Sequence, residues 1–72
     1  MRSVADLRKG EKSVIRSFTD LALSLRLLEM GCLPGSEISL DFIAPLGDPI
    51  GVKLQSSCLS MRKAEAATIL ID

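Results

Sequence analysis

The residues best suited to hold a metal ion in this chain are two cysteines and a few carboxylates. Cys32 and Cys58 lie far apart in the sequence and lack the short CxxC spacing of common zinc sites. Glu29, Asp41 and Asp48 could each supply a carboxylate, but surface carboxylates without a recognised spacing bind divalent ions weakly and promiscuously. The chain contains no histidine, the commonest ligand for zinc and related metals. The sequence therefore predicts no specific metal site, no cofactor and two reduced thiols.

The absence of histidine also removes the side chain that most readily exchanges protons near neutral pH. Ser13, Ser24 and Ser39 have no histidine that could activate them as nucleophiles. No pair of carboxylates can be placed in an apolar pocket as an acid and a base. The glycines form no GxxxxGK motif for binding phosphates. We therefore predict a protein that is not an enzyme, has no catalytic residues and does not itself bind GTP.

Length and composition indicate one small folded domain over residues 1–72, because 47% of them are hydrophobic. Nine basic and nine acidic residues cancel, and Phe18 and Phe42 are the only aromatic residues, so we expect no binding to nucleic acid. Charged residues such as Asp6 and Arg8 interrupt the N-terminal region, and no apolar run approaches the roughly 20 residues that cross a bilayer. We therefore predict a cytoplasmic protein without a signal peptide and without direct membrane insertion.

Residues 20–30 are predicted to form the one substantial helix of the chain. Asp20, or alternatively Thr19, can cap its start by accepting a hydrogen bond from the first turn, and Gly31 can end it in the left-handed conformation. At about 100° per residue, its apolar side chains form two stripes on roughly opposite sides. The stripes consist of Leu21, Leu25 and Leu28, and of Leu23, Leu27 and Met30. A helix on a sheet normally buries one stripe, so loops or the N-terminal segment cover the other, or another protein contacts it.

Five short segments are predicted to form strands, because apolar and polar residues alternate in most of them. They cover residues 12–18, 38–42, 50–54, 58–61 and 68–71. Residues 62–66 can add a single helical turn. Strands this short in so small a chain close best into a strongly bent barrel, which also limits exposed edges. The order of elements therefore predicts a mainly β fold, a small SH3-like barrel of about five strands with the helix inserted after the first.

Alternation also assigns the faces of these strands. In the first strand, Ile15 and Phe18 are expected to point inward, with a bend near Ser17. The residues expected to point inward in the other strands are Ile38, Leu40, Phe42, Ile50, Val52, Leu54, Leu59, Met61, Ile69 and Ile71. Gly51 is expected to face outward, and Ile43 either faces outward or begins a bulge.

Residues 44–49 connect two of the predicted strands, because two prolines and a glycine stop the alternation. One interpretation is structural: Gly47 supplies a turn, and Asp48 caps it by bonding nearby backbone N–H groups. The other interpretation is a loop that docks a partner, since SH3-like barrels usually bind through loops at one end. Leu46, Gly47 and Asp48 would then be the contact residues.

Three motifs of this chain together resemble the FeoA family. Residues 27–35, LLEMGCLPG, are similar to its LLxLGxxPG pattern, and residues 44–50, APLGDPI, agree with the family segment at every position. Residues 59–71 are similar to its closing LxLRxxxAxxIxV pattern, so the resemblance covers essentially the whole chain. Two features depart from the family. The reversal at 56–57 lacks a glycine, and Leu21 and Leu25 of the helix stand where family members are often polar.

The resemblance implies a non-enzymatic accessory role in ferrous iron uptake, in which the protein docks on the cytoplasmic GTP-binding portion of a FeoB-type transporter and modulates its activity or assembly. An alternative is a free-standing regulatory module of a metal-dependent transcription factor, since the fold also resembles the C-terminal domain of iron-dependent repressors. A homodimer is a further alternative, because symmetric homodimers are common. The candidate partner-binding residues are Leu21, Leu25, Leu28, Leu46, Gly47 and Asp48.

Overall fold

The computed structural model describes residues 1–72 and contains five strands, two α-helices and one short 3-10 helix. In chain order the elements are η1 (Val4–Asp6), β1 (Lys12–Phe18), α1 (Leu21–Glu29), β2 (Glu37–Ile43), β3 (Ile50–Lys53), β4 (Cys58–Met61), α2 (Lys63–Ala66) and β5 (Ile69–Ile71). This order confirms the predicted helix between the first two strands and the helical turn before the last strand. The short helix η1 is an addition to the predicted elements.

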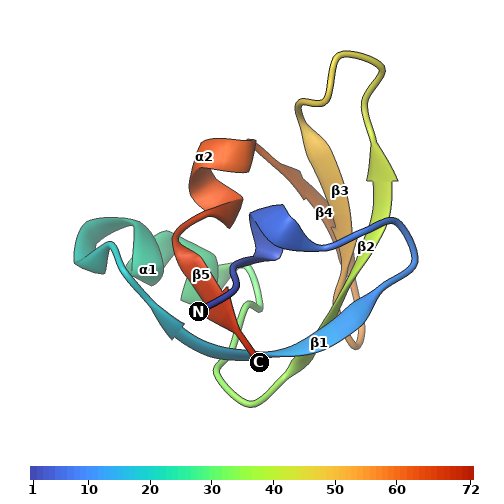
Figure 1. Ribbon diagram of the computed structural model, residues 1–72. Coiled ribbons are helices and arrows are strands. Elements are labelled where there is room, and N and C mark those ends of the chain that lie inside the picture. The colour runs from blue at the N-terminus through green and yellow to red at the C-terminus, as the bar shows by residue number, and fades with distance from the viewer.

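All five strands pair antiparallel in one sheet with the order β4-β3-β2-β1-β5. The sheet bends strongly and curves round η1 (Figure 1). Because β4 and β5 lie at the two ends of this order and do not pair with each other, the sheet does not close into a complete ring of hydrogen bonds. The fold is therefore mainly β and SH3-like, with an open, curved sheet in place of a fully closed barrel.

Side chains from every strand and from all three helices meet in one hydrophobic core. Its fourteen buried members are Val4, Leu7, Ile15, Leu27, Cys32, Ile38, Leu40, Ile50, Val52, Leu54, Met61, Ala66, Ile69 and Ile71. Leu59 is partly buried and packs against them. These positions confirm the predicted inward residues of the strands, with one exception in β2.

A bulge in β1 accounts for its imperfect alternation. The pairing of β1 with β5 matches Ile15 to Ile71 and Phe18 to Ile69, and the register shifts between Ile15 and Ser17. The extra residue lets Ile15 and Phe18, three positions apart, both turn toward the core. Ile15 is fully buried and Phe18 partly buried, so the predicted inward positions and the bend near Ser17 are confirmed.

The prediction that Phe42 points inward is wrong. The pairing of β2 with β3 shifts register between Leu40 and Phe42, so an extra residue interrupts the alternation and leaves Phe42 45% exposed. The ring of Phe42 lies over Gly51 of β3, where an added Cβ would overlap the ring atoms. Gly51 is consequently buried, against the expectation that it faces outward. A glycine is needed here because the aromatic ring occupies the space of a side chain.

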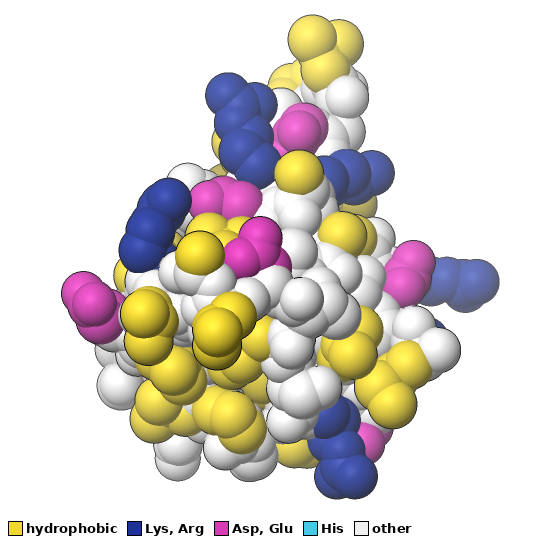
Figure 2. Space-filling model, turned by 90° about the vertical axis from the view of Figure 1, so that its left-hand side faces the viewer, with side chains coloured by type: hydrophobic (Ala, Val, Ile, Leu, Met, Phe, Trp, Pro, Cys, Tyr) yellow, Lys and Arg dark blue, Asp and Glu magenta, His cyan; other side chains and the backbone are white.

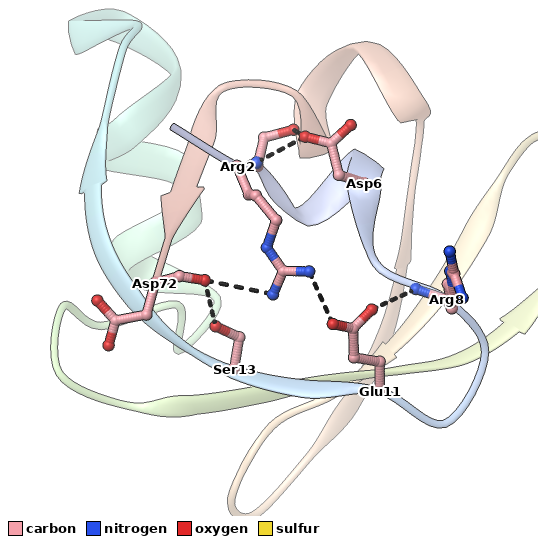
Figure 3. A network of polar contacts seen from close by, with 7 residues as sticks. Arg2, Asp6, Arg8, Glu11, Ser13 and Asp72 are labelled. Carbon is pink, nitrogen blue, oxygen red and sulfur yellow. Dashed lines mark hydrogen bonds and ion pairs between the residues drawn. The ribbon is translucent and has the colours of Figure 1, made fainter.

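A polar network joins the two ends of the chain (Figure 3). Arg2 donates hydrogen bonds to the Glu11 carboxylate at 2.7 Å and to the backbone oxygen of Asp72 at 3.3 Å. The hydroxyl of Ser13 donates to the same Asp72 oxygen at 3.1 Å. The backbone N–H of Arg8 donates to Glu11 at 2.9 Å, and this bond, followed by the bond from Arg2, lowers the pKa of the Glu11 carboxyl. The network holds the first residues of the chain against its last one.

Candidate functional site

Both ends of α1 carry the predicted caps. The carboxylate of Asp20 accepts a hydrogen bond from the backbone N–H of Leu23 at 3.0 Å. At the other end, Gly31 has a φ of +100°, a conformation that glycine adopts without a Cβ penalty. The N–H of Cys32 then donates to the carbonyl of Leu27 at 2.9 Å. These caps confine α1 to nine residues, about two and a half turns.

One side of α1 faces the core and lies between the two predicted stripes. Leu27 is 2% exposed, and Ser24 is buried with its hydroxyl donating to the backbone oxygen of Leu21 at 2.6 Å. Leu23 and Leu28 flank these two residues and are half-buried. The helix therefore buries its serine side with parts of both stripes, and it leaves the opposite side of the helix in contact with solvent.

The solvent side of α1 exposes two large apolar side chains, Leu21 at 84% and Leu25 at 61%. They are four residues apart, so their side chains lie next to each other on the helix surface. We call this pair the helix patch. Figure 2 shows the side of the molecule that carries α1, where hydrophobic side chains gather in the lower part of the view. Leu28, the third predicted contact residue on this helix, is partly packed against the protein.

The loop between β2 and β3 forms a second exposed surface. Leu46 is 97% exposed, and its loop projects beyond the sheet at the top of Figure 1. The N–H of Gly47 donates to the carbonyl of Ala44 at 2.7 Å, which closes the predicted turn, and Gly47 has a φ of +90°. We call Leu46, Gly47 and Asp48 the loop tip.

Asp48 does not cap its own turn, so that part of the structural interpretation is wrong. Its Oδ1 accepts a hydrogen bond from the backbone N–H of Lys63 at 3.0 Å. Lys63 is the first residue of α2, where unpaired N–H groups and the helix dipole favour a carboxylate. Asp48 therefore ties the loop to α2, fifteen positions away in the sequence.

The helix patch and the loop tip lie at different places on the molecule, because α1 and the loop between β2 and β3 lie apart (Figure 1). The six candidate contact residues thus lie on two separate surfaces. Phe42 and Ile43, at the base of the loop, are 45% and 44% exposed and add apolar area there. Sequence reasoning missed Phe42, although the glycine opposite it at position 51 was a usable signal, since aromatic rings often cover strand glycines.

The two cysteines have different surroundings. Cys32 is buried in the core, and burial raises the pKa of its thiol. Cys58 lies exposed on β4, and the two sulfurs form no disulfide. No three side chains of cysteine, aspartate or glutamate come together in a group that could hold a metal ion.

None of the helices is long and apolar enough to span a membrane.

Comparison with models of known protein families shows the family of this chain. The model of the FeoA domain family matches residues 2–72. This chain belongs to the FeoA family. The match extends over both exposed surfaces, so the helix patch and the loop tip are parts of the FeoA domain.

Solved FeoA structures have the same fold over almost the full chain. FeoA from Chlorobium tepidum shares 31% identity at a TM-score of 0.88, over 97% of this chain and 68% of that one. FeoA from Stenotrophomonas maltophilia, solved in complex with zinc and described as a procaryotic SH3 domain protein, shares 26% identity at a TM-score of 0.88, over 100% of this chain and 91% of that one. These likenesses confirm the SH3-like fold class.

The same fold occurs outside the FeoA family. A manganese-dependent transcriptional repressor matches with a TM-score of 0.89 and 15% identity, over 99% of this chain and 40% of that one. Identity this low shows a shared fold alone.

Proposed function

We propose that this FeoA family member is a non-enzymatic cytoplasmic accessory protein of ferrous iron uptake. It docks on the cytoplasmic GTP-binding portion of a FeoB-type transporter and alters the nucleotide cycle or the assembly of that transporter. Family membership supports the role in iron uptake, and the S. maltophilia FeoA is described as a possible ferrous iron transport activating factor.

The helix patch is the observation that carries the docking proposal. Leu21 and Leu25 are largely exposed and contribute little to the core of their own chain. Burying one leucine side chain is worth about 1.5–3 kcal/mol, and a tenfold shift of an equilibrium needs about 1.4 kcal/mol of differential affinity. Two leucines that become buried against one state of a transporter and not the other are therefore enough to bias it between the two. Leu46 at the loop tip offers a second apolar contact.

The substitution Leu25→Glu tests the proposal, because it places a charge in the helix patch. We expect a folded protein whose affinity for the purified GTP-binding portion of the transporter, measured by calorimetry, falls at least about tenfold. Ser56→Glu is the matched control, since it adds the same charge in the exposed turn between β3 and β4. Equal affinity of both variants would remove the helix patch from the interface, and unfolding of Leu25→Glu would make Leu25 a core residue.

Sedimentation of the same variants tests self-association. The wild-type chain could be a dimer that Leu25→Glu converts to a monomer, while neither variant binds the transporter. This pair of results would mean that the helix patch contacts a second copy of the chain. Such a result would replace the transporter in the proposal, since symmetric homodimers use one surface on both copies.

A second candidate function comes from the resemblance of this fold to a repressor domain, and the shared fold at a TM-score of 0.89 is compatible with it without showing the role. In this alternative the chain is a free-standing regulatory module of a metal-dependent transcription factor. Calorimetry against a purified repressor and against the transporter separates the two. Binding to the repressor alone would reverse the order of the candidates.

A further inference from the structure

A polar groove crosses the strands of the sheet, at a place that neither exposed apolar surface includes. It has a volume of about 530 Å³, and one of its eight lining residues is hydrophobic. The lining comes from the start of β1, from β2 with the turn before it, and from the end of β3 with the turn after it. A groove of this composition suits a small, charged ligand.

Two lysines stand on either side of the groove in one row across three strands. Lys12 of β1 pairs with Ser39 of β2, and Ser39 pairs with Lys53 of β3. Residues directly opposite each other point to the same face of a sheet, and neighbouring strands lie about 4.8 Å apart. The two lysine Cα atoms are therefore about 10 Å apart, with Ser39 between them. Their flexible four-carbon stems let both ammonium groups reach one ligand above Ser39.

Neither lysine has a carboxylate partner in the protein. The ion pairs of the molecule join Arg2 to Glu11, Arg16 to Asp72 and Arg26 to Glu65. Glu37 is the one carboxylate in the groove lining, which therefore carries two positive charges and one negative charge. The groove is thus a positively charged place on a chain whose total charge is zero.

Hydrogen-bond donors in the lining add to this charge. Ser36 and Ser39 are half-buried. Several other hydroxyls of the chain donate hydrogen bonds within the protein, whereas those of Ser36 and Ser39 make none. Lysine binds phosphate as a compact point charge, and a tetrahedral oxyanion accepts donors from several directions at once. No aromatic side chain lines the groove, so a nucleobase would find no stacking partner.

We propose that this groove binds a phosphoryl group, held between Lys12 and Lys53 with the Ser39 hydroxyl beneath it. Free inorganic phosphate and the terminal phosphates of a nucleotide share this chemistry. The chain contains no GxxxxGK loop, so the phosphates of a nucleotide would not be enclosed here as they are in a P-loop. This inference does not depend on docking to a transporter.

The test is a titration of the full, isotopically labelled chain with inorganic phosphate, followed by amide chemical shifts at constant ionic strength. We expect saturable shifts confined to the groove residues, which are residue 12 and the ranges 35–39 and 53–55. A parallel titration with GTP identifies the source. Equal affinities indicate a site for free phosphate, and affinity for GTP at least tenfold higher indicates a site for nucleotide phosphates. Absence of saturation with either probe overturns the proposal.

Variants make the test specific. Lys12→Met and Lys53→Met are each expected to weaken phosphate binding about fivefold, since an exposed ion pair is worth up to about 1 kcal/mol. Glu37→Gln is expected to strengthen binding, because it removes a negative charge from the lining. Lys9→Met is the control, as Lys9 lies in the exposed turn before β1 and outside the groove. If Lys9→Met weakened phosphate binding as much as the groove variants do, the proposal would be overturned. A titration with hexaglutamate, an acidic peptide, is the second check: shifts in the groove with this peptide and none with phosphate would also overturn the proposal.

Discussion

The helix patch and the loop tip expose leucines to a similar extent, yet the residues around those leucines differ in what they do for the fold. In the loop, Gly47 closes the turn and Asp48 binds the first N–H of α2. In α1, Leu21 and Leu25 point away from the core that Leu27 of the same helix enters. The fold thus accounts for two of the three residues of the loop tip, whereas it gives no reason for leucines in the helix patch.

This difference shows how structural and functional reasons can be separated in a small domain. A residue that makes an intramolecular bond can be retained for folding alone, so its match to a family motif says little about docking. An exposed leucine gains nothing from folding and presents apolar area to solvent. Leu21, Leu25 and Leu46 are therefore the stronger candidates for contact with a partner, and Gly47 and Asp48 the weaker ones.

The sharpest test of this comparison uses two leucines of the same helix. We expect Leu27→Ala to lower the free energy of unfolding by about 2–5 kcal/mol, because it leaves a cavity in the core. Leu25→Ala should change that free energy by no more than about 0.5 kcal/mol, because Leu25 lies at the surface. Urea denaturation measures both. If both variants lowered the free energy of unfolding by a similar amount, the side of α1 that carries Leu25 would be packed and not exposed to solvent.

A second test concerns the loop tip. Asp48→Ala should lower the free energy of unfolding by about 1 kcal/mol, since it removes a hydrogen bond to the first N–H of α2. Leu46→Ala in the same loop is the control and should leave stability unchanged while weakening partner binding. If Asp48→Ala instead left stability intact and abolished binding, the loop tip would equal the helix patch as a docking surface.

The smallest expected effect lies in the network at the chain ends, which serves as a reference outside both surfaces. The pKa of Glu11 is lowered in the folded protein, so its contribution to stability is present above its ordinary value of 4.5 and is lost as pH falls through the lowered value. The Tm of the wild type is expected to fall between pH 7 and acidic solution, and we expect a smaller fall in Glu11→Gln, because this variant has no carboxylate to protonate at position 11. Glu29→Gln, on the surface of α1, is the control. An unchanged acid profile in Glu11→Gln would contradict this role of the network.

Much of the fold follows from short-range patterns in the chain. Asp20 and Gly31 mark the ends of α1 because capping acts within a few residues. Alternation located the strands because neighbouring side chains must point to opposite faces of a sheet. The motifs at 27–35 and 44–50 were enough to indicate the FeoA family, which the family comparison confirmed.

Other features depended on how distant segments meet. The bulge before Phe42 turned its ring outward onto Gly51, and Asp48 found its partner on α2. Which side of α1 is buried was decided by the core around Leu27 and Ser24, and not by the helical period alone. The row that joins Lys12 to Lys53 exists only because two strand registers place both residues opposite Ser39. Local patterns specify elements and their ends, and a break in alternation can indicate a bulge, as near Ser17. Strand register and long-range hydrogen bonds arise only when the sheet is assembled.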